Sequence, residues 1–392
     1  MRTAVETRVP SKVMHICLSR SWGGLEMYPG RVASEFQRQG WEVHGVALAD
    51  SHVADSLKAV GVTPLVFGSP IAALLAARTI LRYLRREGIQ VVHCHKSGDM
   101  RLGALLVALA PDLRLFFTEH MGARKPKKDW YHRWAYGKVQ KVFAISESTR
   151  AGNLEALPLP AQRIRRLYPG VDFAPFDTPL PQADRRRLRT SLGAPPGGLL
   201  IALPGRITPE KGHGLLLEAL ALLRERALAT PWACVMIGAP TENDARAERF
   251  ARQLKERASA LGLAEQVTFA GFRRDLPACL QAVDVVCIPS RNEPFGLAVI
   301  EALAAGNPVI GSASGAIPEL VAPQWGCTAD PDDPRQWADA LQWVLTSAEQ
   351  RQALGKAGSA WVRQTFAMDV HVQALIAAYR GEDQPVRQSA SA

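Results

Sequence analysis

The chain has 392 residues, of which 47% are hydrophobic and 21% are charged. This length and composition exclude a disordered chain and favour two globular domains. The net charge of +10 comes from the first half, because residues 1–200 hold 29 Lys and Arg against 16 Asp and Glu. No zinc-finger, KH or RRM motif accompanies this charge, so phosphates or anionic lipid headgroups are favoured over nucleic acid as its partners.

The N-terminal segment is polar, and residues 1–12 are predicted to be a flexible extension. The apolar run from Val13 to Leu18 is too short for a signal peptide. The longest apolar stretches, Ile71–Leu84 and Leu102–Ala110, contain arginines or stop before a proline, well below the length of a membrane span. We therefore expect a cytoplasmic protein.

Short apolar runs alternate with amphipathic segments along the whole chain, which is typical of parallel sheets covered by helices. A Pro- and Arg-rich region from Pro158 to Gly198 interrupts this alternation and marks the domain boundary. The sequence predicts an α/β fold with two doubly wound, Rossmann-like domains, residues 13–185 and 195–365, and a C-terminal helix, 366–382, that crosses back to the first domain. The strand-like runs are 13–19, 42–48, 89–95, 113–120, 141–146, 198–206, 233–239, 266–272, 284–290 and 307–313.

Six scattered cysteines form no CxxC pair and are interpreted as buried thiols in a reducing compartment. The segment His93-Cys94-His95 is the one cluster of side chains whose types could bind a metal ion. Neighbouring residues on a strand point to opposite faces, however, so Cys94 and its two neighbours cannot converge on one ion. No metal site is expected.

Two glutamates lie eight residues apart in the segment EPFGLAVIE, at Glu293 and Glu301. Pro294 suits a helix start and Gly306 a position just past a helix end, which predicts a helix over residues 295–305. Free N–H groups at the start of this helix would favour an anion such as a diphosphate. Surface glutamates on an amphipathic helix are the alternative.

Two cations, Arg206 and Lys211, follow a strand in LPGRITPEKGHG. Fixed cations at this place can stabilise a departing diphosphate without a metal ion. A turn with two solvated bases is the alternative. The GxxxxGK[ST] pattern is absent, which excludes a P-loop ATPase.

Together these motifs resemble the donor site of family 4 retaining glycosyltransferases of the GT-B fold, and the likeness runs from about Val13 to Tyr379. It implies an acceptor-binding first domain and a nucleotide-sugar-binding second domain. It also implies that Arg206 and Lys211 bind the donor diphosphate, that Glu293 contacts the transferred sugar and that Glu301 binds the ribose. Further donor contacts would come from Phe295, Gly296 and Leu297 and, at the base, from Phe272 and Arg273 in the segment Gly271–Arg273.

In the first half, Gly23 and Gly24 resemble the family's glycine loop, which would let backbone N–H groups approach donor phosphate or acceptor. The alternative is that these two glycines only form a tight turn between a strand and a helix. His120 follows a strand where the family places a histidine against a sugar hydroxyl, so His120 joins Glu293, Arg206 and Lys211 as a catalytic candidate, although a structural histidine is the alternative. The turn at Pro169 departs from the family, whose members usually have Asn-Gly there. Acceptor candidates are Glu26, His95, Lys96, Arg124, Lys127, Lys128 and Trp130.

The reaction that the resemblance implies is transfer with retention by front-face attack, in which the departing phosphate accepts the proton. We expect a UDP-sugar donor, no cofactor and no metal requirement, because no DxD cluster is present. The partner would be an anionic glycan or glycolipid, with phosphorylated lipopolysaccharide core as the leading candidate, met through transient contact with the inner face of the membrane. A nucleotide-sugar epimerase and a non-catalytic nucleotide-sugar-binding protein are the alternatives.

Overall fold

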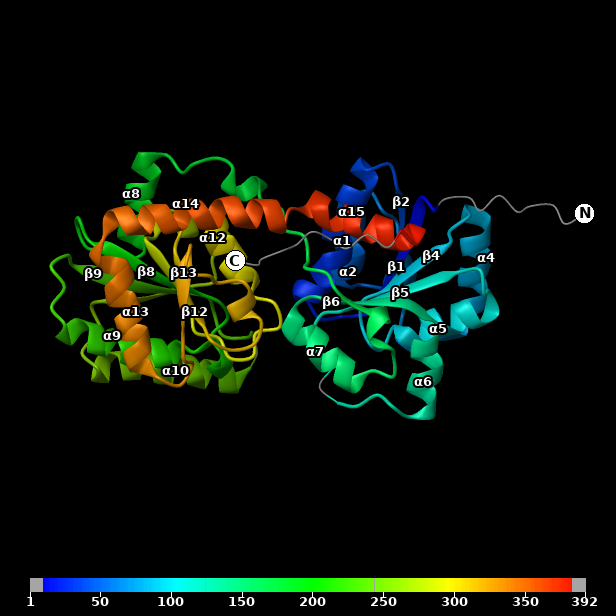
Figure 1. Ribbon diagram of the computed structural model, residues 1–392, viewed down its shortest axis with the longest axis horizontal. Helices are drawn as coiled ribbons and strands as arrows, with labels where there is room; N and C mark the ends of the chain where they lie inside the picture. The colour runs from blue at the N-terminus through cyan, green and yellow to red at the C-terminus, as the bar shows by residue number, and fades with distance from the viewer. Residues whose placement is uncertain (1–9, 124, 243, 383–392) are drawn as a thin grey trace, which may run out of the picture. The chain divides into compact units, whose positions relative to one another are not determined.

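The computed structural model describes residues 10–123, 125–242 and 244–382, and it divides into two compact units (Figure 1). The first comprises residues 1–171 and 366–392, and the second comprises residues 172–365. Residues 172–185, which the sequence pattern assigns to the first domain, lie in the second unit. Most of the proposed extension at residues 1–12 lies outside the described residues.

The first unit contains a seven-stranded parallel sheet with the order β3-β2-β1-β4-β5-β6-β7. Its strands are β1 (Lys12–Cys17), β2 (Glu42–Leu48), β3 (Leu65–Phe67), β4 (Val91–Cys94), β5 (Arg114–Glu119), β6 (Val139–Ala144) and β7 (Ile164–Arg166). Its helices are α1 (Gly24–Arg38), α2 (His52–Ala59), α3 (Pro70–Leu75), α4 (Ala77–Glu87), α5 (Met100–Leu109), α6 (Trp130–Gly137), α7 (Glu147–Ala156) and α15 (Met368–Arg380).

Helices cover both faces of this sheet, which explains why its strands read as unbroken apolar runs. Along β1, Met14 and Ile16 join the core on one face, whereas Val13 and Cys17 join the core on the other. The C-terminal helix α15 packs on α1, and its Tyr379 stacks on Phe36 with ring centroids 5.8 Å apart. The last described helix is therefore part of the first unit's core.

The second unit contains a six-stranded parallel sheet with the order β10-β9-β8-β11-β12-β13. Its strands are β8 (Leu199–Pro204), β9 (Trp232–Ile237), β10 (Val267–Gly271), β11 (Val285–Ile288), β12 (Val309–Ser312) and β13 (Gly326–Ala329). Its α-helices are α8 (Gln182–Ser191), α9 (His213–Glu225), α10 (Ala245–Ala260), α11 (Leu276–Ala282), α12 (Leu297–Ala304), α13 (Pro334–Thr346) and α14 (Ala348–Thr365).

The sequence pattern missed three edge strands and misplaced one helix start. Strands β3 and β7 have three residues each, and β13 has four. Such short strands do not show the sequence pattern from which a strand is predicted. The helix expected over residues 295–305 begins at Leu297, because Gly296 has φ +98° and breaks the helical backbone. Among the described residues, no helix is long and apolar enough to cross a membrane.

Candidate active site

A short ion pair at the carboxyl edge of the second sheet joins Lys211 and Glu293. The Lys211 ammonium donates to Glu293 Oε2 at 2.6 Å, and both side chains are mostly buried. Lys211 ends a short 3₁₀ turn after β8, and Glu293 lies in the loop after β11. β8 and β11 are neighbours in the sheet, so the topology alone brings the two predicted residues together.

Gly212 holds these two loops in contact. It has φ +73°, and a Cβ at this position would stand 2.3 Å from the carbonyl oxygen of Pro289 at the end of β11. A side chain would therefore be strained and would also push the β8 loop away from the β11 loop. The glycine between Lys211 and the first residue of α9 is a requirement of the site's geometry.

Arg206, the second predicted cation, follows Gly205 at the end of β8 and is exposed. In the part of the chain that the structure describes, no carboxylate forms an ion pair with its guanidinium. Close backbone contacts surround this loop, since a Cβ on Gly238 would meet the carbonyl oxygen of Gly205 at 1.8 Å. The guanidinium is therefore available to an anion.

The loop before α12 is braced by a neighbouring turn. The N–H of Ala316 donates to the carbonyl oxygen of Glu293 at 2.9 Å, and Gly315 approaches the Glu293 backbone so closely that a Cβ would lie 2.6 Å from its nitrogen. Phe295 is buried, and Gly296 caps the helix. The N–H of Val299 already donates to the Gly296 carbonyl oxygen at 2.9 Å, so the N–H groups of Leu297 and Ala298 are the ones at the start of α12 that could bind an anion. Glu301 lies in the second turn of this helix.

The predicted base contacts lie at the end of the edge strand β10. Phe272 is 74% exposed, and Arg273 forms a bidentate pair with Asp275 at 2.8 and 2.6 Å. An exposed aromatic ring at a carboxyl strand end is suited to stacking on a nucleobase. The Arg273 guanidinium already donates two hydrogen bonds to Asp275. It therefore has fewer N–H groups left for a ligand than the sequence analysis assumed.

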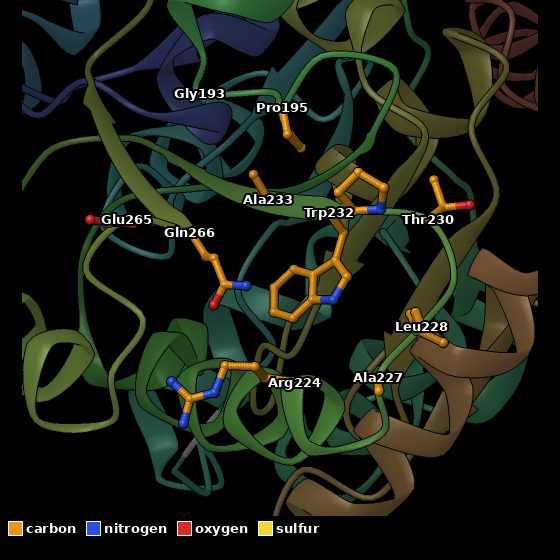
Figure 2. A pocket seen from close by; sticks show the side chains of 11 residues that line it. Gly193, Pro195, Arg224, Ala227, Leu228, Thr230, Trp232, Ala233, Glu265 and Gln266 are labelled. Atoms are coloured by element: carbon orange, nitrogen blue, oxygen red, sulfur yellow. The ribbon is translucent and has the colours of Figure 1, made fainter.

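A pocket of about 380 Å³ in the second unit lies elsewhere (Figure 2). Its lining includes Trp232 and Ala233 at the start of β9 and Gln266 just before β10. These residues mark the amino edge of the sheet, opposite the edge that carries Lys211 and Glu293. Doubly wound sheets bind ligands at the carboxyl edge, so we do not assign the donor to this pocket.

In the first unit, a buried carboxylate joins the loops after β1 and β4. Asp99 accepts the N–H of Leu18 at 3.1 Å and the N–H of Lys96 at 2.9 Å, and burial raises the pKa of Asp99 to about 7. The Lys96 ammonium donates to Ser19 Oγ at 3.1 Å, and Ser19 Oγ donates to Glu26 Oε1 at 2.8 Å. The predicted residues Glu26 and Lys96 are thus joined through Ser19, which the sequence analysis did not single out.

A second lysine lies beside this group. The Lys127 ammonium donates to Ser97 Oγ at 2.5 Å and lies 3.8 Å from Glu119 Oε2, and burial lowers the pKa of Lys127. Lys128 is exposed, and Trp130 at the start of α6 is 81% exposed. Arg124 lies outside the described residues. Of the predicted acceptor residues, Lys96 and Lys127 have ordered partners, whereas Lys128 and Trp130 form open surface.

His120 and His95 lie within a larger group of buried rings. His120 packs edge-on against Tyr28, with centroids 5.0 Å apart, and burial lowers the pKa of His120 to about 3. His95 lies against His120 and against His15 on β1, which the sequence reading did not single out. His15 lies opposite His93 on the adjacent strand β4, a register that becomes visible only in the structure. Cys94 lies in the core on the opposite face, as strand alternation predicts.

The turn at Pro169, which departs from the family pattern, packs against α15. A Cβ on Gly170 would meet Met368 and His371 within 2.9 Å. The turn therefore has a packing role inside the first unit.

Each half of the chain is similar to a glycosyltransferase domain. Residues 184–361 match the family model described as Glycosyl transferases group 1, and residues 22–174 match the model of Glycosyltransferase Family 4. The two matched segments cover most of the two Rossmann-like units, so each unit is similar to a glycosyltransferase domain and the pair has the GT-B fold.

Similar proteins narrow this class only in part. A D-inositol 3-phosphate glycosyltransferase of Jonesia denitrificans is 36% identical over 222 residues, which cover 56% of this chain and only about half, 51%, of that protein. One of Corynebacterium efficiens is 28% identical over 369 residues, with 85% of each chain covered. Among solved structures, a glycosyltransferase from Rickettsia africae has a TM-score of 0.84 at 19% identity and covers 95% of this chain and 98% of its own. Anabaena HepE in complex with UDP has 0.81 at 20%, with 94% and 100% covered, and both likenesses concern the fold.

Proposed function

We propose that this chain transfers a sugar from a nucleotide diphosphate sugar, with retention of the anomeric configuration, to a phosphate-bearing acceptor. The observation that carries the proposal is the Lys211–Glu293 pair, with Arg206 on the same loop as Lys211, at the carboxyl edge of the second sheet. Anions bind at this edge in doubly wound sheets, and here two cations and a helix N-terminus meet there.

The donor diphosphate would lie on Arg206, Lys211 and the first N–H groups of α12. Its leaving oxygen gains negative charge as the glycosidic bond breaks, and fixed cations stabilise that charge most in the transition state. Glu293 holds the Lys211 ammonium in place and would contact the transferred sugar, while Glu301 would bind the ribose hydroxyls. Phe272 would stack on the base.

The proposed reaction uses neither a protein base nor a metal ion. The acceptor hydroxyl would attack the anomeric carbon on the face from which the phosphate departs, and the departing phosphate would take the hydroxyl proton, which gives retention. His120 is neutral at pH 7, because burial lowers its pKa, so it would contact the sugar as a hydrogen-bonding group without charge. A UDP-sugar is the proposed donor, in keeping with the UDP complex of the structurally similar HepE.

The acceptor would bind to the first unit near Lys96 and Lys127. The Lys96 ammonium donates to one serine hydroxyl, which leaves N–H groups for a phosphate, whereas Lys127 donates to Ser97 and Tyr136 beside Glu119 and would contribute mainly its charge. The similar D-inositol 3-phosphate glycosyltransferases name an inositol phosphate as acceptor, and phosphorylated lipopolysaccharide core carries the same anionic group on a glycan. Either acceptor would be met in the cytoplasm, the latter at the inner face of the membrane.

A product screen tests the proposal. The chain is incubated with UDP-, GDP- and ADP-sugars, each with inositol phosphate, with lipopolysaccharide core or with no acceptor, and the products are read by mass spectrometry. We expect a glycosylated phosphate-bearing product and nucleoside diphosphate, with NMR showing the donor's anomeric configuration and with equal rates in EDTA. An isomerised donor without acceptor would instead indicate an epimerase, and binding without turnover a non-catalytic protein.

A further inference from the structure

The two lysines of the proposed acceptor site depend on one short turn after β4. Residues 96–99 form this turn, in which the N–H of Asp99 donates to the carbonyl oxygen of Lys96 at 2.9 Å. Lys96 is the first residue of the turn, and the hydroxyl of the next residue, Ser97, accepts a hydrogen bond from the Lys127 ammonium at 2.5 Å. The position of this turn therefore influences where both ammonium groups lie.

The Asp99 carboxylate closes this turn and ties it to a second loop. Its Oδ2 accepts the N–H of Lys96 at 2.9 Å, and its Oδ1 accepts the N–H of Leu18 at 3.1 Å. Leu18 follows β1 and precedes Ser19, whose hydroxyl accepts a hydrogen bond from the Lys96 ammonium at 3.1 Å. One carboxylate thus fixes the backbone on both sides of the contact between Lys96 and Ser19.

The backbone of Asp99 is itself held firmly. Asp99 directly precedes α5, and its carbonyl oxygen accepts the N–H of Gly103 at 3.0 Å. A Cβ on Gly103 would stand 2.7 Å from Cys94 Sγ, so α5 lies close against β4. In the described part of the chain, the Asp99 side chain caps no N–H group of its own helix, although an aspartate at a helix start commonly does so. Its two hydrogen bonds go to the loops instead.

We propose that Asp99 is a positioning residue, which holds the Lys96 and Lys127 ammonium groups where an acceptor phosphate would bind. The inference rests on the proposed function, because it concerns the support of the same acceptor site. Asp99 would not touch the substrate, since its carboxylate is buried and each of its oxygens accepts a backbone N–H group. It would act on Lys96 through the turn and on Lys127 through Ser97.

A carboxylate suits this place better than an amide of the same shape. Burial raises the pKa of Asp99 from 3.8 to about 7, so ionisation is less favourable here than in water. An asparagine would avoid that cost, but it has an oxygen at only one of the two positions, and its NH₂ group would face the N–H at the other. Only the carboxylate can hold both loops at once.

Chemical labelling of lysines tests the positioning without any substrate. The native protein and Asp99→Asn are acetylated at pH 8, where the Asp99 carboxyl is ionised, and the rate at each lysine is read by peptide mass spectrometry. We expect Lys96 to react about threefold faster in Asp99→Asn, because its ammonium is released from Ser19. Lys356 is exposed on α14 in the second unit and serves as the internal reference.

Ser51→Ala is the matched control for a lost loop contact. The Ser51 hydroxyl is buried in the loop after β2, where it accepts the N–H of Ala54 at 3.3 Å. This variant should lower the Tm without changing the labelling rate of Lys96. Hydrogen exchange of the native protein covers the case in which Asp99→Asn does not fold. Fast exchange of the Leu18 and Lys96 amides would overturn the inference, because the Asp99 carboxylate would then hold neither loop.

Acceptor kinetics separate this inference from the proposed function. With the donor and acceptor found in the product screen, Asp99→Asn should raise the acceptor KM about tenfold and change kcat and the donor KM by no more than about twofold. In the double variant with Lys96→Met, the increase in acceptor KM should be smaller than the product of the two single increases, because both changes remove one contribution.

Two results would overturn the inference, namely an unchanged acceptor KM in Asp99→Asn or equal labelling of Lys96 in Asp99→Asn and the native protein. A native protein that transfers sugar to no phosphate-bearing acceptor would instead contradict the proposed function. The labelling rates would still decide whether Asp99 positions Lys96.

Discussion

The Lys211 ammonium and the Glu293 carboxylate depend on each other for their positions, so each should affect turnover. Lys211→Ala removes a cation from the leaving diphosphate, and we expect turnover to fall about 10²- to 10³-fold with the Tm nearly unchanged. Glu293→Gln should also lower turnover, because the ammonium loses its charged partner. Steady-state rates with the donor found in the product screen are the measurement. Arg257→Ala is the control, since it breaks an exposed 2.6 Å pair with Glu218, and unchanged turnover in Lys211→Ala would contradict the assignment.

His213, the first residue of α9, should make the second unit sensitive to acid. Burial lowers the pKa of His213 from 6.5 to about 4. Between these values the unfolded chain binds a proton that the folded chain does not, so stability is full above pH 6.5 and falls as the pH is lowered to about 4. The shift corresponds to about 3 kcal/mol, and His213→Gln should remove that share of the pH dependence.

Hydrogen exchange of peptides from β8 and β9, followed between pH 7 and pH 4, measures this local stability. His52→Gln is the control, because His52 is exposed in the first unit and should leave the profile of the native protein intact. A His213→Gln profile identical to the native one would show that His213 does not carry the effect.

At the scale of elements, Gly212 joins β8, α9 and the end of β11. Gly212→Ala would bring its Cβ against the Pro289 carbonyl at a φ of +73°, so we expect a loss of about 1–3 kcal/mol of stability together with reduced turnover. Gly61→Ala shares the positive φ but meets nothing within 4 Å, so it should cost less stability and no turnover. Urea unfolding and steady-state rates separate the two effects. Equal losses in both variants would mean that the contact with β11 has no special importance.

Most of the strands that could be predicted from the sequence have both faces buried, although the partly buried edge strand β10 was predicted as well. β1, β4 and β8 are continuous apolar runs, and the loops that follow them carry the motifs, so strand order placed Lys211 beside Glu293. The start of α12 was misjudged because Pro294 suits a helix start, whereas the structure has a left-handed backbone at Gly296 and begins the helix after it. The convergence of His15 with His95 depends on register between strands about 80 residues apart, which no local pattern contains.

At the scale of the whole molecule, the positive charge gathers in the first 200 residues, and aromatic side chains are exposed among it. Trp130 and Trp134 of α6 are 81% and 40% exposed, next to Lys125 and Lys128. Tryptophan favours the membrane interface, and each basic residue near an anionic surface contributes about 1 kcal/mol. We expect this part of the first unit to bind anionic bilayers.

Sedimentation with vesicles tests that expectation. The protein should sediment with vesicles rich in phosphatidylglycerol and stay in solution with pure phosphatidylcholine. Raising the salt from 0.1 to 0.5 M should release it, because screening then shortens the reach of the basic residues to a few ångströms. Trp130→Ala combined with Lys128→Ala should weaken binding at least tenfold, whereas Trp343→Ala, which removes an exposed tryptophan from the second unit, should have no effect. Equal binding to both kinds of vesicle would rule out charge as the cause of membrane binding. The basic residues of the first unit would then serve acceptor binding alone.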